Sequence, residues 1–425
     1  MAHYSLDILF WSCIGGVVYH YAGYPLLLFI VSTLSQAKSD LLYLLGRSNR
    51  RCEPVMRELP RVALLISAYN EESVIQAKVK NCFEIDYPVD RLEMFFGLDA
   101  PTDSTHELLA HIACNRVNVV EFITRRGKLA VLCDLAQRTS AEILVFTDAN
   151  TMLAPNCIRN FVRHFSDPQV GSVSGEEIRT VAPGTDPAAE SVYWRYESAM
   201  KILESRLNCS LGGNGAALAI RRSLFRPTKQ SIVEDFQIPL EIRFKGFRVV
   251  YDPEVIAVEE ITPNYAAQFA RRVRIGAGNY QTLFRNLDYL NPLQGLLAFC
   301  FFSHRVLRWL VPLFLVTALV CSVVMARDPE FGLLAVLQCA FYLMAVAGYY
   351  RKKGGRPAGL FSVPLYFCSM NLALLLGFHA YLTGRQSVVW NATPRRFDSR
   401  TQQESLLNRP VDLEASSSAL QRPAA

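Results

Sequence analysis

The chain has 425 residues, of which 51% are hydrophobic and 19% are charged, and its formal net charge is +6. This composition is more apolar than that of an ordinary soluble enzyme. The positive charge suits an anionic membrane surface or anionic ligands. No basic run carries interleaved aromatic residues, which argues against nucleic-acid binding. The eleven cysteines include no C-x-x-C pair, which argues for buried thiols rather than disulfides or zinc.

The apolar residues are concentrated in four uncharged segments, which are residues 8–37, 309–326, 331–350 and 358–384. Each is near or above the roughly 18–20 residues that a helix needs to cross a bilayer. For segment 309–326 the alternative is a buried core helix. For the first segment the alternative is a signal peptide, but it has no basic leader and no obvious A-x-A cleavage site. We therefore expect a membrane anchor there.

Basic residues set the expected orientation of these segments. The first segment is followed by Lys38, Arg47, Arg50, Arg51 and Arg57. The positive-inside rule therefore predicts that residues 36–292 lie in the cytoplasm. A second inside loop is marked by the basic cluster at residues 351–356.

The end of the chain leaves the number of crossings open. Four full crossings would place the tail outside, whereas its basic residues favour the inside; these are Arg385, Arg395, Arg396 and Arg400. Pro364 and Asn371 allow a broken or re-entrant last segment, and residues 291–302 could lie in the interface. The Ser/Ala/Pro-rich end at 402–425 is expected to be disordered.

The pattern divides the chain into four parts. We expect an anchor at 1–37, a cytoplasmic domain at 38–290, an interfacial helix with membrane helices at 291–386, and a basic, then disordered, tail at 387–425. The cytoplasmic part alternates between strand and helix patterns. Strands are predicted at 61–67, 92–98, 117–123 and 142–146, and helices at 72–83, 106–113 and 128–137. This rhythm predicts an α/β domain with a mostly parallel sheet covered by helices on both faces.

Three of these strands end in acidic or amide residues, which parallel strands bring to one edge of the sheet. The segment EILVFTDANT at 142–151 is the most informative of them. Asp148 and Asn150 flank the small Ala149, so both side chains can point toward one cation. The alternative is an acidic turn that caps a helix.

Eight motifs in register give the chain a resemblance to a known family. They are LLISAYNEE (64–72), GLDAPTDST (97–105), RRGK (125–128), FTDANT (146–151), SGEE (174–177), GGNGA (212–216), VEDFQIP (233–239) and RRVRIGAGNYQ (271–281). In this order they resemble the membrane-bound, inverting family 2 glycosyltransferases, which include cellulose, chitin, hyaluronan and poly-N-acetylglucosamine synthases. The resemblance covers roughly residues 60–315 and implies a GT-A type nucleotide-sugar-binding domain.

The resemblance implies roles at the donor side of the site. Residues Ala68, Asn70 and Glu71 would hold the base and ribose, and Asp99 would contact the uracil. Glu71 could instead cap the following helix, and Asp103 could be a turn residue. Lys128 either approaches the diphosphate or solvates a helix start.

A divalent cation, Mg²⁺ or Mn²⁺, is the cofactor that the resemblance implies. Asp148 and Asn150 occupy the family's D-x-D position. Asn150 is a neutral oxygen ligand, so the site loses one negative charge that the metal would favour. Asp148 and the substrate phosphates can still hold a metal.

The catalytic base is predicted to be Asp235, because inverting transfer needs a carboxylate that takes the acceptor proton. The alternative is that Glu234 and Asp235 cap the helix that follows. By resemblance the acceptor side is lined by Glu176, Glu177, Gly213, Asn214 and Glu234. Glu176 and Glu177 could instead belong to a solvated turn, and the glycines to an ordinary loop.

The last motif bears on the product. Polymerising relatives have Q-x-x-R-W here, where the Arg meets the diphosphate and the Trp stacks on the acceptor sugar. This chain places Arg271 at the Gln, keeps the arginine as Arg274 and has Ile275 at the Trp. Arg272 and Arg274 are therefore assigned to the donor, with a headgroup-facing helix as the alternative for Arg271 and Arg272. The missing indole favours addition of one or a few sugars over processive synthesis.

The sequence thus predicts an inverting glycosyltransferase at the inner membrane of a bacterium. It would move a sugar from a nucleoside-diphosphate donor, with UDP favoured, to a saccharide or lipid-linked acceptor in surface polysaccharide or glycolipid synthesis. The alternatives are a processive synthase that exports its product and a catalytically silent scaffold. Partner subunits of an assembly system are possible, and a soluble nucleotidyltransferase would not explain the anchors.

Overall fold

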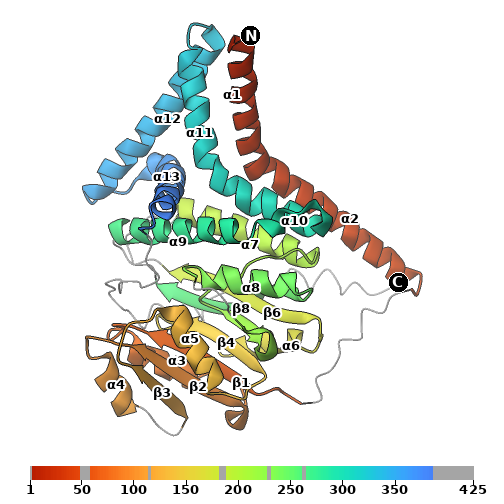
Figure 1. The fold of residues 1–425 in the computed structure, drawn as a ribbon, viewed down its shortest axis with the longest axis vertical. Coiled ribbons are helices and arrows are strands. Elements are labelled where there is room, and N and C mark those ends of the chain that lie inside the picture. The colour runs from red at the N-terminus through yellow and green to blue at the C-terminus, as the bar shows by residue number, and fades with distance from the viewer. Residues whose placement is uncertain are drawn as a thin grey trace, which may run out of the picture.

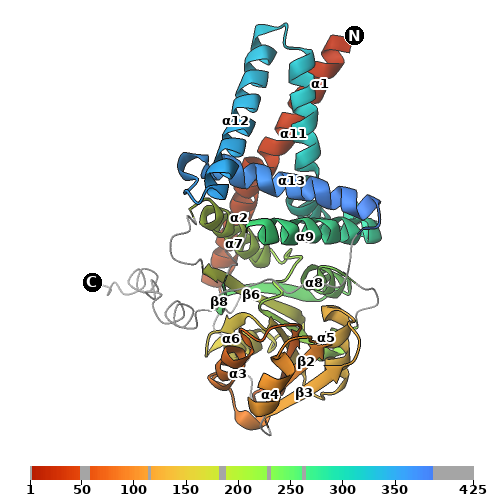
Figure 2. The ribbon, with the colours of Figure 1, turned by 90° about the vertical axis from the view of Figure 1, so that its left-hand side faces the viewer.

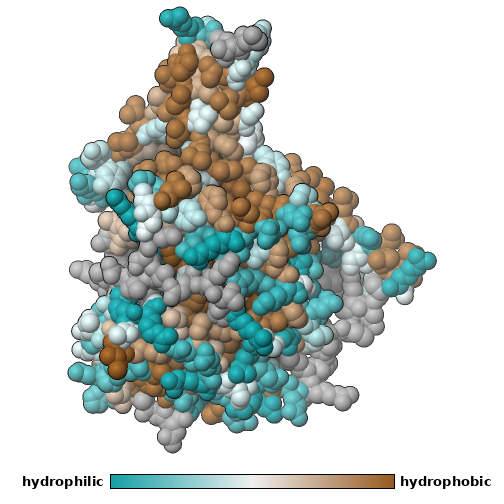
Figure 3. Space-filling view, viewed as in Figure 1, coloured by the Kyte–Doolittle hydropathy of each residue, from teal (hydrophilic) through white to brown (hydrophobic). Residues whose placement is uncertain are grey.

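A computed structural model describes residues 2–47, 58–112, 116–180, 188–226, 231–260 and 265–385. The molecule is elongated and has three parts along its length (Figure 1). Long helices form one end, helices lying across the long axis form the middle, and a sheet covered by helices forms the other end. The long helices present mostly hydrophobic residues and the sheet domain mostly hydrophilic ones (Figure 3).

The sheet contains eight strands among the described residues. Their bounds are β1 Val62–Ala68, β2 Leu92–Asp99, β3 Val117–Phe122, β4 Ile143–Asp148, β5 Thr151–Leu153, β6 Val170–Thr180, β7 Leu218–Arg221 and β8 Arg248–Glu260. The strand order is β3-β2-β1-β4-β7-β6-β8-β5. Strands β1 to β4 and the pair β6/β8 are parallel, whereas β7 runs antiparallel to both its neighbours. The carboxyl ends of β1, β2 and β4 therefore share one edge of the sheet.

Strands β1, β2 and β4 are buried on both faces, as their continuous apolar runs predict, whereas the edge strand β3 is only partly buried. In β1, Val62, Leu64 and Ile66 pack into one core while Ala63 and Leu65 pack into the other. The first core is covered by α3 (Ile75–Phe83), α4 (Thr105–Ile112) and α6 (Cys157–His164), and the second by α5 (Lys128–Gln137) and α8 (Glu234–Phe244). This arrangement confirms the predicted α/β domain with helices on both faces.

Most predicted elements of this domain are found within two residues of their expected bounds. The helix expected from Glu72 begins at Ile75, because the carbonyl of Glu71 first closes a turn with the amides of Val74 and Ile75. The turn expected at Glu176 and Glu177 is wrong. Strand β6 continues through both residues, because it pairs in parallel with β8 after a bulge at Gly175.

The middle part consists of α7 (Ala188–Arg206), α9 (Tyr265–Arg285) and α13 (Ser362–Leu382). Helices α9 and α13 lie side by side (Figure 2). A Cβ atom added at Gly377 would lie 2.8 Å from the backbone nitrogen of Ala277, so only glycine permits this approach. Phe284 stacks on Tyr381 at a ring-centroid distance of 5.4 Å and extends the same contact.

The long helices form the third part. The first runs from α1 (Ala2–Val18) through a π turn, η1 (Tyr19–Gly23), into α2 (Tyr24–Leu44). The second runs from α10 (Leu296–Cys300) through a π turn, η6 (Phe301–Val306), into α11 (Leu307–Val324), and α12 spans Pro329–Lys353. Short 3-10 turns lie at η2 (Val89–Arg91), η3 (Arg222–Leu224), η4 (Leu287–Leu290), η5 (Pro292–Gln294) and η7 (Gly359–Phe361).

By length and composition, four stretches of the described helices can cross a membrane, and they are 4–44, 296–324, 329–353 and 359–382. Their directions differ. Helices α1, α11 and α12 run along the long axis in both views, whereas α13 lies across it (Figures 1 and 2). The last apolar segment is thus laid on α9 rather than bundled with the other three.

Candidate active site

One cavity of about 730 Å³ connects the sheet to the middle helices. At the sheet it is lined by Ser67 and Asp148, at the carboxyl ends of β1 and β4. Towards the membrane helices it is lined by residues of α7, α9, η6, α11 and α13. The cavity therefore has a sheet end and a membrane end, and most of the predicted site residues lie at the sheet end.

Lys128 joins the two acidic motifs at the sheet end. Its Nζ lies 2.7 Å from Oδ1 of Asp148 and 2.8 Å from Oε1 of Glu234. Burial lowers the pKa of Lys128, but Asp148 and Glu234 outweigh burial and raise it above its ordinary value. Lys128 therefore does not solvate a helix start; it holds a positive charge between two carboxylates.

Asp235 faces the cavity beside the glycine loop. Its Oδ2 accepts a hydrogen bond of 3.1 Å from the amide of Gly215, and its carbonyl accepts one of 2.9 Å from Gly213. Burial, reinforced by the charge of Glu234, raises the pKa of Asp235 to about 6. The glycines permit this packing, since a Cβ at Gly213 would lie 2.8 Å from the Asp235 carbonyl oxygen.

This geometry bears on the capping alternative for Asp235. Helix α8 begins at Glu234, and its N-cap residue Val233 makes no side-chain cap. The carboxylate of Asp235 is aimed at the glycine loop instead of the amides of its own helix. A raised carboxyl pKa in a cavity is typical of a general base.

Asp99 holds the RRGK loop. Its two carboxylate oxygens accept hydrogen bonds from the amides of Arg126 (2.7 Å) and Gly127 (3.0 Å), and its side chain is fully buried. It does not line the cavity. Asp99 therefore positions the loop that carries Lys128. Arg125 of the same loop stacks on Tyr69, with its Cζ 3.3 Å from the ring centroid.

The residues after β1 form the rim of the sheet end. Asn70 adopts a left-handed conformation (φ 53°), and its Oδ1 accepts a hydrogen bond of 2.8 Å from the amide of Thr102. Glu71 lines the cavity, while Ala68 is buried at the end of β1. Asp103 accepts a hydrogen bond of 3.0 Å from the amide of Thr105, so it is a turn residue.

Asn150 is tied to a buried carboxylate. Its Nδ2 donates a hydrogen bond of 2.8 Å to Oε1 of Glu259, which is 3% exposed. Arg271 donates to the same oxygen at 2.8 Å. An aspartate at position 150 would face Glu259 as a second buried carboxylate, which explains physically why this chain carries an amide there.

The sheet end also fits a divalent cation. Asp148 lines the cavity, and Ser67, its register partner across β1 and β4, has a buried hydroxyl without a hydrogen-bond partner among the described residues. No group of three His, Cys, Asp or Glu side chains that could hold a metal occurs in the described ranges. The residues that would hold the ion are therefore Asp148 and neutral oxygens, and most ligands would come from the diphosphate.

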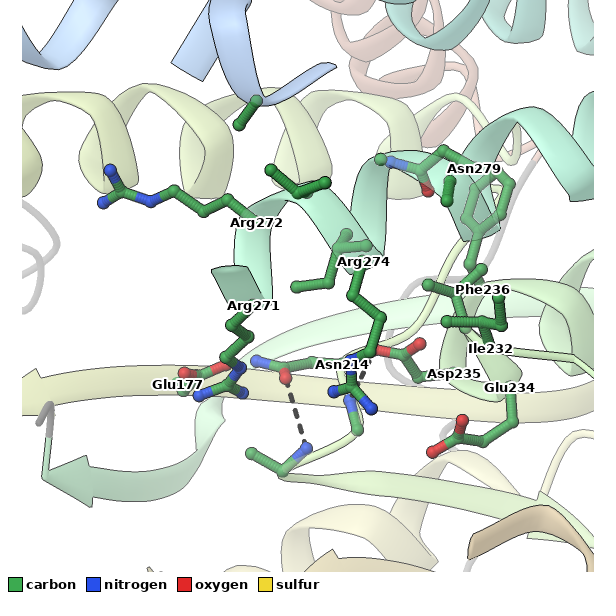
Figure 4. A pocket seen from close by; sticks show the side chains of 18 of the residues that line it. Glu177, Asn214, Ile232, Glu234, Asp235, Phe236, Arg271, Arg272, Arg274 and Asn279 are labelled. Carbon is green, nitrogen blue, oxygen red and sulfur yellow. Dashed lines mark hydrogen bonds between the residues drawn. The ribbon is translucent and has the colours of Figure 1, made fainter. Parts of the chain in front are cut away.

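The arginines of α9 point in different directions (Figure 4). Arg271 and Arg274 extend toward the sheet, where Arg274 lies near Asp235, while Arg272 points away from them. Arg272 donates to Ser369 (3.5 Å) and lies over Tyr366. Arg274 makes no hydrogen bond or ion pair with the described residues, and burial lowers its pKa. It is thus available to an anion in the cavity. Ile275 is 36% exposed and lines the cavity.

The two acidic residues of SGEE point to different surroundings. Glu177 lines the cavity and pairs with Arg179 at 2.6 Å, and burial is the main cause that raises its pKa. Glu176 bonds to Ser198 and Tyr251 and does not line the cavity. Asn214 is 8% exposed and lines the cavity, and its Oδ1 accepts from the amide of Ala216 (Figure 4).

The membrane end contains residues that the motifs did not indicate. They are Tyr193, Trp194, Glu197, Lys201, Arg305, Arg308, Trp309 and Tyr366. Trp194 lies under Arg179 at 3.9 Å, and its indole nitrogen is buried without a hydrogen-bond partner among the described residues. The cavity therefore has an indole although the position of the family's tryptophan holds Ile275. No sequence signal joins these residues, because they come from separate helices.

Comparison with known proteins identifies the family. A family model described as "Glycosyltransferase like family 2" matches residues 60–278, just over half of the chain. The chain belongs to this family. The resemblance to the family 2 glycosyltransferases that was inferred from the motifs is confirmed.

Two curated relatives of this chain are named as synthases of different products. A β-monoglucosyldiacylglycerol synthase of Synechocystis is 26% identical over 304 residues, which are 66% of this chain and 61% of the relative. A poly-β-1,6-N-acetyl-D-glucosamine synthase of Staphylococcus aureus is 21% identical over 245 residues, which are 56% of this chain and 59% of the relative. The chain thus spans about three fifths of the length of these relatives.

A solved structure shares the fold. The mannosyltransferase PcManGT from Pyrobaculum calidifontis, in complex with GDP-Man and Mn²⁺, superposes with a TM-score of 0.66 at 22% identity. The match covers 89% of this chain and all of that chain. It confirms the predicted GT-A fold with its helical additions.

Proposed function

We propose that this glycosyltransferase acts with inversion. It moves a sugar from a nucleoside-diphosphate donor, a UDP-sugar, to a saccharide or lipid-linked acceptor in surface polysaccharide or glycolipid synthesis. The observation that carries this proposal is Asp235, a half-buried carboxylate with a raised pKa in the same cavity as Asp148 and Arg274, and Arg274 makes no ion pair with the described residues.

Each group has a step to perform. Asp235 takes the proton of the acceptor hydroxyl as the hydroxyl oxygen forms its bond to the anomeric carbon. The bond from that carbon to the donor phosphate breaks on the opposite face, and the electron pair leaves with the nucleoside diphosphate. Arg274 and Lys128 stabilise the charge on this leaving group. Glu177, Asn214 and Glu234 line the remaining sides of the cavity.

A divalent metal is part of the proposal. The related fold of PcManGT carries Mn²⁺ with its nucleotide sugar. When bound, Mg²⁺ or Mn²⁺ supplies positive charge against the diphosphate. Asp148 is the residue we assign to it, and Asn150, which is hydrogen-bonded to Glu259, is its neutral neighbour.

We further propose that three helices cross the inner membrane and that the catalytic domain is cytoplasmic. Helices α1, α11 and α12 run together along the long axis, whereas α13 lies across it on α9 (Figure 2). Three crossings put the chain after α13 on the same side as the catalytic domain. This parity agrees with Arg385 and the other basic residues of the tail, whose positions 387–425 lie outside the described residues.

The test is release of nucleotide by the purified protein in nanodiscs. UDP-, GDP- and dTDP-sugars would be supplied with Mg²⁺ or Mn²⁺, with and without membrane lipid extract, and Asp235→Asn would be the control. Donor-selective release that the variant abolishes supports the proposal. Absence of release with every donor would favour the silent scaffold, and long products would favour a processive synthase.

A further inference from the structure

The membrane end of the cavity carries an excess of positive charge. Apart from Arg271 and Arg274, which extend toward the sheet, its lining residues on α7, α9, η6 and α11 include four cations, which are Lys201, Arg272, Arg305 and Arg308. The same helices contribute one carboxylate to the lining, that of Glu197. The sheet end, in contrast, pairs its cations with Asp148, Glu177, Glu234 and Glu259.

Glu197 does not neutralise its neighbours. Arg308 donates directly to Glu197, and the carboxylate also accepts from the hydroxyl of Tyr193. Arg305 lies farther away, at 3.9 Å, and its Nε is buried without a hydrogen-bond partner among the described residues. One carboxylate is therefore engaged by one arginine, and the second arginine stays largely uncompensated.

Lys201 is the second cation without a close carboxylate partner among the described residues. The structure gives it no hydrogen bond or ion pair with the described residues, and its nearest ring contact is Tyr251, at 5.4 Å from Nζ to the centroid. Burial lowers the pKa of Lys201 and the charge of Arg305 adds to this, while the charges of Glu197, Glu176 and Glu177 act in the opposite direction without reversing it. Partly buried cations without a close carboxylate partner are costly, and an anionic ligand would offset that cost.

The surroundings of Arg305 suggest what the anion belongs to. Arg305 lies in the π turn η6, a kind of turn that is frequent at functional sites. Its Cζ lies 5.5 Å from the ring centroid of Phe236, the residue after Asp235. An anion on Arg305 would thus lie near the start of α8, the helix that carries the proposed base, on the side assigned to the acceptor.

The wall around these cations is apolar. Trp309, Met370, Ala373 and Leu374 line the cavity from α11 and α13. Helix α11 is one of the three helices proposed to cross the membrane, and α13 lies across the molecule beside α9 (Figure 2). A cationic pair within an apolar wall suits an amphiphile better than a free soluble anion.

We propose that Lys201 and Arg305 bind the phosphate group of a lipid acceptor, which presents a nearby hydroxyl to Asp235. The inference rests on the proposed function and names its acceptor class. The ligand is a lipid with a phosphate-bearing head group, as opposed to a neutral lipid.

The test uses dodecyl phosphate as the probe and the full-length protein in a neutral detergent. Calorimetry would compare dodecyl phosphate, dodecanol and inorganic phosphate. Dodecyl phosphate is expected to bind, and Lys201→Gln and Arg305→Gln are each expected to weaken it by about tenfold or more. The matched control is Arg195→Gln, because Arg195 lies on α7 with Lys201 but is exposed and outside the cavity.

The outcomes separate the inference from the proposed function. Absence of dodecyl phosphate binding, or binding that neither variant weakens, overturns the inference. Equal binding of inorganic phosphate overturns the assignment to a lipid. If Arg305→Gln does not fold, Lys201→Gln alone decides.

A second measurement follows the product. Labelled sugar transferred into a membrane lipid extract would be separated by anion exchange, and product in the retained, phosphate-bearing fraction is expected. Product only in the neutral fraction overturns the inference while the transferase itself stands. Absence of nucleotide release in the same preparation counts against the proposed function instead.

Discussion

The two ends of the cavity differ in how their charged side chains are paired. At the sheet end Lys128 lies between Asp148 and Glu234, and Arg271 pairs with Glu259. At the membrane end Lys201 makes no ion pair with the described residues, and Arg305 reaches Glu197 only at 3.9 Å, with its Nε left without a hydrogen-bond partner among them. A site whose charges are already paired is held rigid before its substrate arrives, whereas unpaired buried charge is held for a ligand. Arg274 is the exception, because it extends toward the sheet end but makes no ion pair with the described residues.

The largest effect is expected from Asp235→Asn. The amide keeps the size of the side chain but cannot take a proton, so kcat should fall by about 10²- to 10⁴-fold while donor affinity is retained. Steady-state kinetics and donor calorimetry measure the two quantities. Glu241→Gln on the same helix is the matched control, since Glu241 contacts Gln237 and not the cavity. Near-normal kcat in Asp235→Asn would remove Asp235 from the mechanism.

Arg274→Gln and Arg272→Gln compare two arginines of one helix. Arg274 makes no ion pair with the part of the chain that the structure describes and faces the sheet end, so its loss should lower kcat/KM for the donor by roughly 10- to 100-fold. Arg272 points away and contacts Ser369, so its loss should change that value by less than about threefold. Equal effects of the two substitutions would contradict the geometry and would indicate that both arginines bind the donor.

The pH dependence of the reaction follows from Asp235. Its pKa is raised to about 6, and only the ionised carboxylate can accept the proton. Activity should therefore be full above pH 7 and fall about tenfold for each pH unit below 6. The rate of nucleotide release between pH 5 and 8 checks this at constant donor saturation. A flat profile over that range would show that another group limits the acid side.

The smallest effect is expected at position 150. In Asn150→Asp a second carboxylate faces the buried Glu259, which should lower the melting temperature by roughly 4–8 °C without improving metal affinity. In Asn150→Asp combined with Glu259→Gln the hydrogen bond is restored in the opposite direction, and stability should recover. An unchanged melting temperature in the single variant would show that Asn150 is not tied to Glu259.

The sequence alone determined what local pattern can encode. The apolar runs of β1 and β4 predicted buried parallel strands, and the motifs around Asp148, Asp235 and Arg274 identified the family. Asp235 and Arg274 lie in the cavity as expected. These inferences succeed because a strand, a turn or a motif is read from neighbouring residues.

Only the tertiary structure decided which distant groups meet. Asp99 and Lys128 were both assigned to the donor, yet the carboxylate of Asp99 accepts hydrogen bonds from amides of the loop that carries Lys128. Asn150 meets Glu259 across 109 positions of sequence, and Arg305 approaches Phe236 from another helix. Helix α13 is apolar enough to span a membrane, but its glycine contact with α9 lays it across the molecule. Close packing and charge pairing depend on the whole fold, so no local pattern contains them.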